Sequence, residues 1–318
     1  MAPLTRFRAD DSHVQLPMVA EYHAQRASVA GTLIISEATF ISKDSGGYPN
    51  VPGIWNREQI DAWKKVTDAV HAKGSFIFCQ LWALGRVAVP DVAAAEGFDI
   101  VSSSPSALEP GAPVPREATK AAIQGFIRDY AQAAKNAIAA GFDGVEVHGA
   151  GGYLIDQFRQ DNCNQRTDEY GGSIENRTRF IHEVVRVVTH AVGVGRVGSL
   201  KSLKLYYLHL IEARVCGNVD SDHTDSLDFA IRAWDDISPI ILAGGYTPAS
   251  AKRVVDEQFE DKNIMVAFGR YFISHPDLPF KIRRELELTP YNRDTFYSPK
   301  LVADYLDYSF SQEFQAQA

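Results

Sequence analysis

The chain has 318 residues, 45% of them hydrophobic and 23% charged, and a formal net charge of −8 at pH 7. This composition is ordinary for a soluble globular protein. The acidic balance argues against nucleic acid or an anionic membrane as a partner, although a local basic pocket for a phosphate stays compatible with it.

Cysteine usage and the amino terminus indicate the cytoplasm. The three cysteines, Cys79, Cys163 and Cys216, have no CxxC or metal-ligand spacing and are too few for a disulfide scaffold, which favours a reducing compartment and predicts no metal site. The first residues lack the apolar segment of a secretory signal, and no apolar run reaches the ~18 residues of a membrane span. We therefore expect a cytoplasmic monomer or homodimer.

Short apolar runs alternate with amphipathic segments along the chain. The apolar runs predict buried strands at residues 31–38, 75–82, 145–148, 205–212, 239–245 and 264–270. Apolar residues at helical spacing predict helices at residues 55–73, 117–140, 173–192, 227–234 and 247–259. Residues 89–115 are rich in Pro, Ser and Ala and read as a long loop. This alternation predicts a parallel sheet covered by helices.

The repeats favour a TIM (β/α)8 barrel, formed as one domain by residues 1–318, over a doubly wound sheet. No GxGxxG follows the first strand, which argues against a dinucleotide-binding Rossmann domain. The sequence contains fewer than the eight βα units of such a barrel, however. Residues 1–5 fit only the tail of a first strand, and residues 193–204 leave room for a stub of a strand but not for a crossover of ~10–12 residues. We expect an incomplete barrel, with a truncated first strand and a missing or collapsed fifth βα unit.

One strand end carries two side chains suited to catalysis. The strand predicted at residues 145–148 ends at His148, and Tyr153 follows in a Gly-rich loop. Chemistry in α/β proteins usually sits at the carboxyl ends of strands. Because an imidazole can donate a hydrogen bond and a phenol can deliver a proton, we expect His148 to polarise a substrate and Tyr153 to protonate it. The local pattern alone fits a histidine at the core edge and a surface tyrosine equally well.

Nine short motifs follow one another along the chain, beginning at residues 2, 22, 36, 79, 148, 164, 243, 268 and 294. The most specific is the run from Asn164 to Phe180, which contains Arg166-Thr-Asp-Glu-Tyr-Gly-Gly. Together these motifs resemble the Old Yellow Enzyme family of FMN-dependent NADPH dehydrogenases and ene-reductases, and fungal members in particular.

The resemblance implies FMN bound across the carboxyl ends of the barrel strands. It assigns the cofactor to Pro3, Leu4, Thr5, Ala38, Gln80, His148, Gly244, Gly245, Gly269, Arg270 and Phe296, and the substrate to His148, Trp82 and Tyr297. The physical chemistry agrees for the phosphate, because backbone N–H groups of Gly loops and an Arg side chain suit an anion. Taken singly, each glycine fits plain turn geometry, and Trp82 fits core packing as well as it fits a substrate wall.

The implied reaction has two steps in one site. NADPH reduces FMN, and the hydride then passes to the C=C bond of an α,β-unsaturated carbonyl compound, an enone or enal, whose oxygen lies at His148. Tyr153 would protonate the α-carbon. Among fungal members such a reaction would belong to secondary metabolism.

The sequence departs from the family pattern in ways that keep other functions open. Gly151 stands where the family usually has an Asn or His that also contacts the substrate oxygen. The family's fifth strand carries an Arg beside the flavin, and neither Arg196 nor Lys201 lies in its motif. The alternatives are a catalytically impaired barrel remnant, either a binding protein or a non-functional paralogue, and a redox-neutral flavin isomerase.

Overall fold

The computed structural model describes residues 1–198, 205–212, 215–216, 219–220 and 226–317, which form an α/β fold. Its helices are α1 (Met18–Arg26), α2 (Arg57–His71), α3 (Pro90–Glu96), α4 (Lys120–Ala139), α5 (Leu154–Arg159), α6 (Ile174–Arg177), α7 (Arg179–Val192), α8 (Asp228–Trp234), α9 (Pro248–Arg253), α10 (Arg270–Ser274), α11 (Leu278–Arg283) and α12 (Gln312–Gln315). Its strands are β1 (Leu33–Ile35), β2 (Thr39–Phe40), β3 (Phe76–Trp82), β4 (Val101–Ser102), β5 (Arg116–Glu117), β6 (Gly144–Val147), β7 (Val197–Gly198), β8 (Leu208–Ile211), β9 (Val215–Cys216), β10 (Val219–Asp220), β11 (Ile240–Ala243) and β12 (Ile264–Val266).

Five of the six predicted strands contain an observed strand, and β6 overlaps the predicted run 145–148 but begins one residue earlier, at Gly144. Three other predictions need correction, and several helices were not predicted. The predicted loop 89–115 holds α3, which starts with Pro90 and ends at the left-handed Gly97, and the short strand β4. The helix predicted at 173–192 is two helices, α6 and α7, which meet at Thr178. The helices α1, α5, α10, α11 and α12 were also not predicted. The helix after Thr247 changes to a π-helix at Val254–Gln258.

The strands follow one another in two parallel sheets, β1-β3-β6-β7 and β8-β11-β12. The first junction between them is a single parallel bridge from Gly198, at the end of β7, to Tyr207. The second is the chain start: Met1 exchanges hydrogen bonds with Leu33 and Ile35, and the Ala2 N–H donates to the Phe268 carbonyl. Within the described ranges the strands thus follow the order of a TIM barrel. The two light junctions, each formed by only a few backbone hydrogen bonds, lie on opposite sides of the ring.

The expected collapse of the fifth unit falls at β7. This strand has only two residues, and residues 199–204, where the expected gap lies, are outside the described ranges. Because only six residues separate Gly198 from Leu205, this stretch is shorter than a crossover with a helix. The fifth strand is therefore a stub, as the sequence predicts.

Side chains alternate across the barrel wall, as they do in any strand. On β3, Ile77, Cys79 and Leu81 pack into the large core shared with α2, α4 and α7. The intervening Phe78 faces inward and packs with Tyr207 and Ile241 from the opposite wall. This alternation means that Gln80 and Trp82 also face the barrel interior, at successively higher levels toward the carboxyl end.

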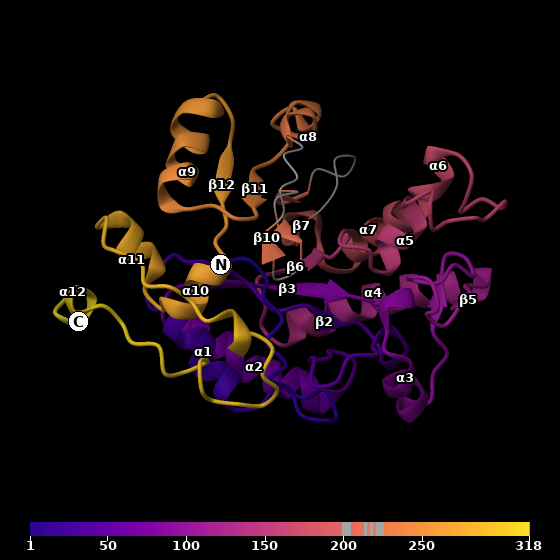
Figure 1. Cartoon of the computed structure of the whole chain (residues 1–318), viewed down its shortest axis with the longest axis horizontal. Helices are drawn as coiled ribbons and strands as arrows, with labels where there is room; N and C mark the ends of the chain where they lie inside the picture. Colours follow the sequence, from indigo (N-terminus) through magenta and orange to yellow (C-terminus); the bar gives the residue numbers. More distant parts are fainter. Residues whose placement is uncertain (199–204, 213–214, 217–218, 221–225, 318) are drawn as a thin grey trace.

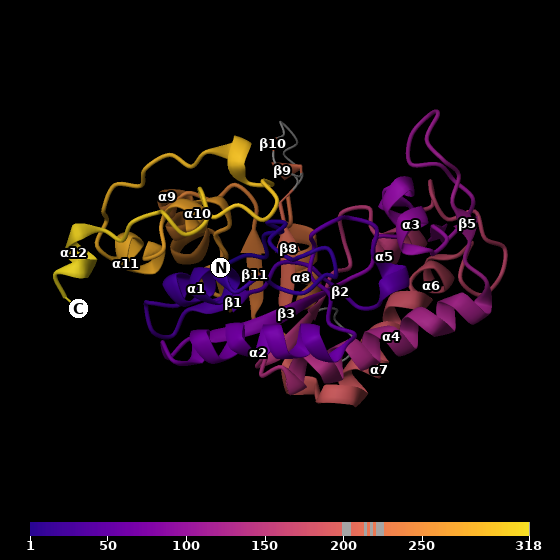
Figure 2. The same ribbon diagram turned by 90° about the horizontal axis from the view of Figure 1, so that it is seen from below.

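The outer helices divide between two cores. Trp63 of α2, Tyr130 of α4 and Phe180 of α7 are fully buried in the larger one. Figure 2 shows these three helices running along one outer side of the molecule. A separate cluster around Trp234 joins α8, β11 and α9, which Figure 1 shows on the side away from α1 and α2. In the described ranges, no helix combines the length and apolar character needed to cross a bilayer.

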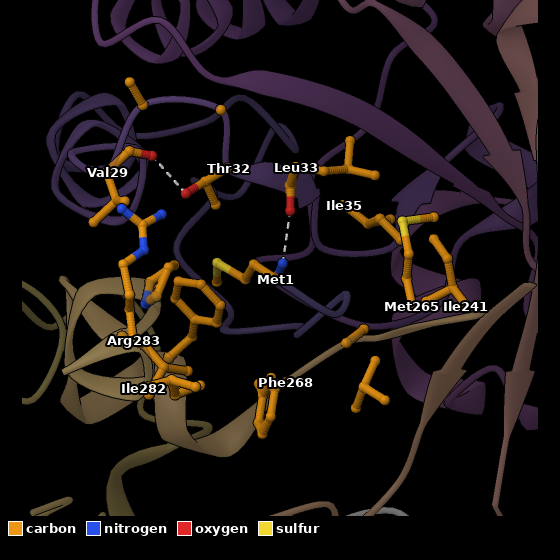
Figure 3. A pocket seen from close by; sticks show the side chains of 17 residues that line it. Met1, Val29, Thr32, Leu33, Ile35, Ile241, Met265, Phe268, Ile282 and Arg283 are labelled. Carbon is orange, nitrogen blue, oxygen red and sulfur yellow. Dashed lines mark hydrogen bonds between the residues drawn. The ribbon is translucent and has the colours of Figure 1, made fainter. Parts of the chain in front are cut away.

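A cavity of about 440 Å³ opens near the amino end of β1 and along β12 and the residues that follow it. Its wall is mostly apolar and includes Met1, Leu33, Met265 and Ile282 (Figure 3). The Met1 amino group donates to the Leu33 carbonyl oxygen at 2.6 Å, and burial lowers the pKa of this amine to about 5. None of the predicted site residues lines this cavity.

Candidate active site

The predicted cofactor and substrate residues gather at one cavity of about 540 Å³ at the carboxyl ends of the strands. The chain start, the ends of β3 and β6 and the segment after α11 all contribute to its wall. The predicted residues among its lining are Pro3, Leu4, Thr5, Ala38, Gln80, Trp82, His148, Tyr153, Phe296 and Tyr297. The fold therefore brings together residues that are nearly 300 positions apart in sequence.

Three rings form the inner wall of this cavity. The edge of Tyr153 meets the face of Trp82, with ring centroids 4.6 Å apart and planes at 83°. The centroid of His148 lies 5.2 Å from that of Tyr153 and 6.1 Å from that of Trp82. Trp82 is 3% exposed, and its Nε1 has no hydrogen-bond partner in the described part of the chain. The wall thus holds a polar N–H without a protein acceptor.

The site keeps its imidazole neutral and its phenol protonated. Burial lowers the pKa of His148 to about 4, an effect that Glu146 and Asp156 oppose and His209 assists. Burial, with smaller contributions from Tyr48 and Tyr297, raises the pKa of Tyr153 to about 12. At neutral pH His148 can therefore donate one hydrogen bond without carrying charge, and Tyr153 holds a proton that it can transfer.

Gln157 of α5 fixes the loop that carries Tyr153. Its amide nitrogen donates to the carbonyl oxygens of Leu84 and Gly152, at 2.9 and 2.8 Å. Its amide oxygen accepts from the Arg86 N–H and from the Ser102 hydroxyl, at 3.1 and 2.9 Å. The side chain is 1% exposed. One buried amide therefore ties the stretch after β3 and the end of β4 to the turn that precedes Tyr153.

Gly151 occupies the turn between the two candidate catalytic residues. Its φ is +73°, in the left-handed region that favours glycine. A Cβ atom here would lie 3.2 Å from the Tyr153 ring and 3.7 Å from Cε1 of His148. Position 151 therefore faces both rings, and its lack of a side chain removes a polar group from the site itself.

The predicted phosphate residues line a second, smaller cavity. It has a volume of about 250 Å³ and includes Gly244, Gly245, Gly269 and Arg270. The Arg270 guanidinium lies 5.6 Å from the ring centroid of Tyr291, which also lines the cavity. A Cβ on Gly269 would lie 3.1 Å from Cδ2 of Leu4, a residue of the larger cavity. The two cavities are thus neighbours, with an apolar-walled part beside a part suited to an anion.

Several residues of the cavity wall were not predicted from the sequence. Phe7, Tyr48, Ile211 and Ile273 also face the larger cavity, and Arg6 contributes to its wall. The centroid of Tyr48 lies 5.9 Å from that of Trp82, and Phe7 meets Tyr297 edge to face at 5.8 Å. Tyr48 follows β2 in a Gly-rich stretch, which is a position after a strand end where a tyrosine could have been noted.

Known proteins with similar sequences are fungal reductases. Chanoclavine-I aldehyde reductase of Penicillium roqueforti is 52% identical over 342 aligned residues, covering 99% of this chain and 93% of that protein. NADP-dependent oxidoreductase lnbE of Aspergillus flavus is 52% identical, covering 98% and 92%. A protein of Epichloe festucae var. lolii named as a probable inactive reductase is 49% identical, covering 99% and 91%. Because these alignments are longer than the 318 residues here, the relatives carry internal residues that this chain lacks.

Solved structures give the same assignment. The Old Yellow Enzyme homologue from Zymomonas mobilis is 35% identical, with a TM-score of 0.86 over 98% of this chain and 95% of that chain. Morphinone reductase is 37% identical, with a TM-score of 0.87 over 99% and 92%. A sequence model of the NADH:flavin oxidoreductase / NADH oxidase family matches residues 1–203. The fold is therefore that of the Old Yellow Enzyme TIM barrels, and the chain belongs to this family of FMN-dependent oxidoreductases.

Proposed function

We propose that this protein reduces the C=C bond of an enone or enal with NADPH as the hydride source and FMN as cofactor. The observation that carries the proposal is the single cavity that joins Tyr153 and His148 to Thr5, Ala38 and Gln80. The name of the Penicillium relative, an aldehyde reductase, supports a carbonyl substrate, and that of the Aspergillus relative supports NADP.

The cavities suit FMN in shape and chemistry. Pro3, Leu4, Thr5, Ala38 and Gln80 would hold the ring system, with Phe296 as a buried apolar neighbour. Gly244, Gly245, Gly269 and Arg270 would hold the phosphate through backbone N–H groups and the guanidinium. When bound, FMN supplies the acceptance and delivery of hydride, while the protein supplies orientation and electrostatics.

His148 and Tyr153 would handle the carbonyl oxygen and the proton. A neutral imidazole N–H can bind the substrate oxygen and stabilise the negative charge that develops on it. The tyrosine phenol can then protonate the α-carbon. Trp82 and Tyr297 would confine the substrate between aromatic walls, and the unpaired Trp82 Nε1 offers a further donor.

A second candidate function is that of an impaired barrel remnant. Three observations favour it: Gly151 provides no second donor, the described part of β7 is two residues long, and one relative at 49% identity is named as a probable inactive reductase. Loss of one oxyanion donor typically costs about 10²–10³ in rate. A redox-neutral isomerase would use the same cavity and cofactor but would consume no NADPH.

The colour of the purified protein separates these functions. A yellow protein that bleaches with NADPH under anaerobic conditions, and regains its colour when cyclohexenone is added, is the proposed reductase. A colourless protein that takes up no added FMN would contradict the proposal and favour the remnant. A yellow protein that isomerises an enone without net NADPH consumption would favour the isomerase.

A further inference from the structure

A layer of polar side chains lies inside the barrel, one level below the candidate active site. Along β8 and the residue before it, Tyr207, His209 and Ile211 alternate. Tyr207, just before the strand, packs in the interior, while Ile211, at its end, lines the active-site cavity. His209 lies between these two levels. Gln80 on β3 and Glu146 on β6 are register partners and occupy the same level.

Glu146 is the centre of this layer. Its Oε1 accepts a hydrogen bond from the Gln80 amide at 2.7 Å, and its Oε2 accepts one from the Tyr207 hydroxyl at 2.9 Å. The same Oε2 lies 2.9 Å from Nδ1 of His209. Burial opposes ionisation of Glu146, but the His209 charge and these hydrogen bonds outweigh it, so the pKa of Glu146 is lowered. A buried carboxylate of this kind requires a cationic or strongly donating partner.

One ring nitrogen of His209 takes no part in the contact with Glu146. Its side chain is 7% exposed, and Nε2 has no hydrogen-bond partner among the described residues. The ring lines a cavity of about 270 Å³ together with Gln80, His148 and Ile211, and these three also line the active-site cavity. A buried polar atom without a partner therefore lies beside the residues proposed to hold the flavin ring.

We propose that His209, which Glu146 holds in place, stabilises the negative charge of the reduced cofactor. This inference rests on the proposed function, since it requires bound FMN. FMN held here would supply the acceptance of a hydride, which is two electrons and one proton released from a C–H bond of NADPH, and would then carry one additional negative charge. The Nδ1–H group donates to Glu146, and a proton on Nε2 would make His209 both a cation paired with this carboxylate and a donor toward the cavity.

Other ionisable groups around this imidazole do not duplicate the role. Glu146 and Tyr207 are its hydrogen-bonded neighbours in the layer, and His148 lies one level above with a lowered pKa. Arg159 lines the same small cavity, but its Nη1 donates to the Gly149 carbonyl at 2.9 Å and lies 3.6 Å from Asp156. On β11 the register partner of His209 is the apolar Ile241.

The test is the midpoint potential of bound FMN in the full-length protein, compared with His209→Asn. The Asn amide can still donate to Glu146 but cannot become a cation. We expect the affinity for oxidised FMN to stay within about threefold, while the relative affinity for reduced FMN falls at least tenfold, which lowers the two-electron potential by about 30 mV or more. His13→Asn is the matched control, because His13 is also buried beside a carboxylate, 3.3 Å from Glu96, but lines neither cavity.

An unchanged potential in FMN-loaded His209→Asn would overturn the inference and leave the proposed function intact. Wild-type protein that binds no FMN would overturn both. If His209→Asn fails to fold, ¹⁵N-histidine NMR of the wild-type holoprotein gives the answer: an imidazolium at His209 in the reduced state supports the inference, and a neutral ring there refutes it.

Discussion

Tyr153 combines a high pKa with a confined position, which is the state expected of a residue that holds a proton until a carbanion forms next to it. Its pKa of about 12 keeps the phenol protonated throughout the neutral range. The ring is held edge-on against Trp82, so its orientation is set by packing. The residue therefore has both the proton and the fixed direction that a general acid requires.

We expect Tyr153→Phe to separate the two half-reactions. Because the phenol acts only on the substrate, reduction of cyclohexenone should fall about 10²–10⁴-fold, while anaerobic flavin reduction by NADPH and its reoxidation by oxygen should persist. Stopped-flow absorbance of the flavin measures each step. Equal loss of both steps would show that Tyr153 is structural.

Gly151→Asn tests whether position 151 is a missing donor. Asn tolerates left-handed backbone better than most residues, yet its Cβ would lie 3.2 Å from the Tyr153 ring, so we expect a stability loss of about 1 kcal/mol. The added amide should raise turnover of cyclohexenone about tenfold or more. The control is Gly152→Asn, with φ +80° and no atom within 4 Å of the added Cβ, which should leave turnover unchanged. An equal or lower rate in Gly151→Asn with full FMN content would refute the missing-donor interpretation.

At the scale of elements, α5 is held to the barrel by core packing and by the hydrogen bonds of one buried amide. The helix has six residues, of which Leu154, Ile155 and Phe158 pack into the large core. Four hydrogen bonds that anchor its start and its neighbours converge on Gln157. Gln157 therefore contributes directly to the position of the Tyr153 loop.

Gln157→Leu should destabilise the protein and impair the Tyr153 step together. The substitution leaves buried donors and acceptors at Leu84, Arg86, Ser102 and Gly152 without their partner, which predicts a loss of about 3 kcal/mol in the free energy of unfolding. Urea unfolding and the rate of enone reduction measure the two effects. Gln160→Leu, one turn away on an exposed site with a 3.3 Å bond to Asp156, should change either quantity little. Equal effects of the two substitutions would contradict the role given to Gln157.

Elements with a continuous apolar pattern could be predicted from the sequence, and those with a polar buried face could not. Strands such as β3 and β11 read as apolar runs because both of their faces are buried. The missed helix α1 buries His23 and Arg26, whose guanidinium donates to carbonyls of Phe272, Ile273 and Tyr305. No local sequence pattern predicts a buried arginine whose hydrogen-bond partners lie some 250 residues away in the chain.

The residues of the candidate site also fall into a group that could be predicted from the sequence and a group that could not. Residues within recognisable motifs, such as His148 and Gln80, could be named from the sequence, and the fold brings them to one cavity. Tyr48 and the His209–Glu146 pair could not, because their relevance depends on which strands become neighbours across the barrel. Side chains on β3, β6 and β8 come close to one another only once the strands have arranged into a ring.

For the whole molecule, buried neutral histidine predicts a loss of stability in acid. Burial, which the Val19 carbonyl partly offsets, lowers the pKa of His23 to about 4, and the side chain is 3% exposed. Since the folded-state pKa is below the unfolded value of about 6.5, the unfolded chain binds the proton first as the pH falls. This contribution is fully present above pH ~6.5 and is lost as the pH falls toward 4, with a size of about 3 kcal/mol.

His23→Gln should flatten this part of the stability profile. Gln can still donate to the Val19 carbonyl but does not titrate, so the slope of unfolding free energy against pH between 4 and 6.5 should decrease by up to one proton. Urea unfolding at several pH values measures the slope. His190→Gln, at an exposed position of α7, should leave it unchanged, and an unaltered slope in His23→Gln would show that His23 is not the group responsible.

The two light junctions of the barrel ring have a consequence for how the protein comes apart. One junction rests on the Gly198–Tyr207 bridge and the other on the bonds of Met1 and Ala2. Each sheet has its own outer hydrophobic cluster, and inside the barrel the two sheets share the cluster of Phe78, Tyr207 and Ile241 and the contact of Glu146 with His209. The proposed flavin residues lie mainly with the first sheet and the proposed phosphate residues with the second. Bound FMN would then connect the two parts. Without FMN the two parts should unfold as separate cooperative units, and with FMN they should unfold as one unit. Native-state hydrogen exchange, with and without added FMN, would detect this merging of two transitions, and the Ala2 and Tyr206 amides at the junctions should report it first.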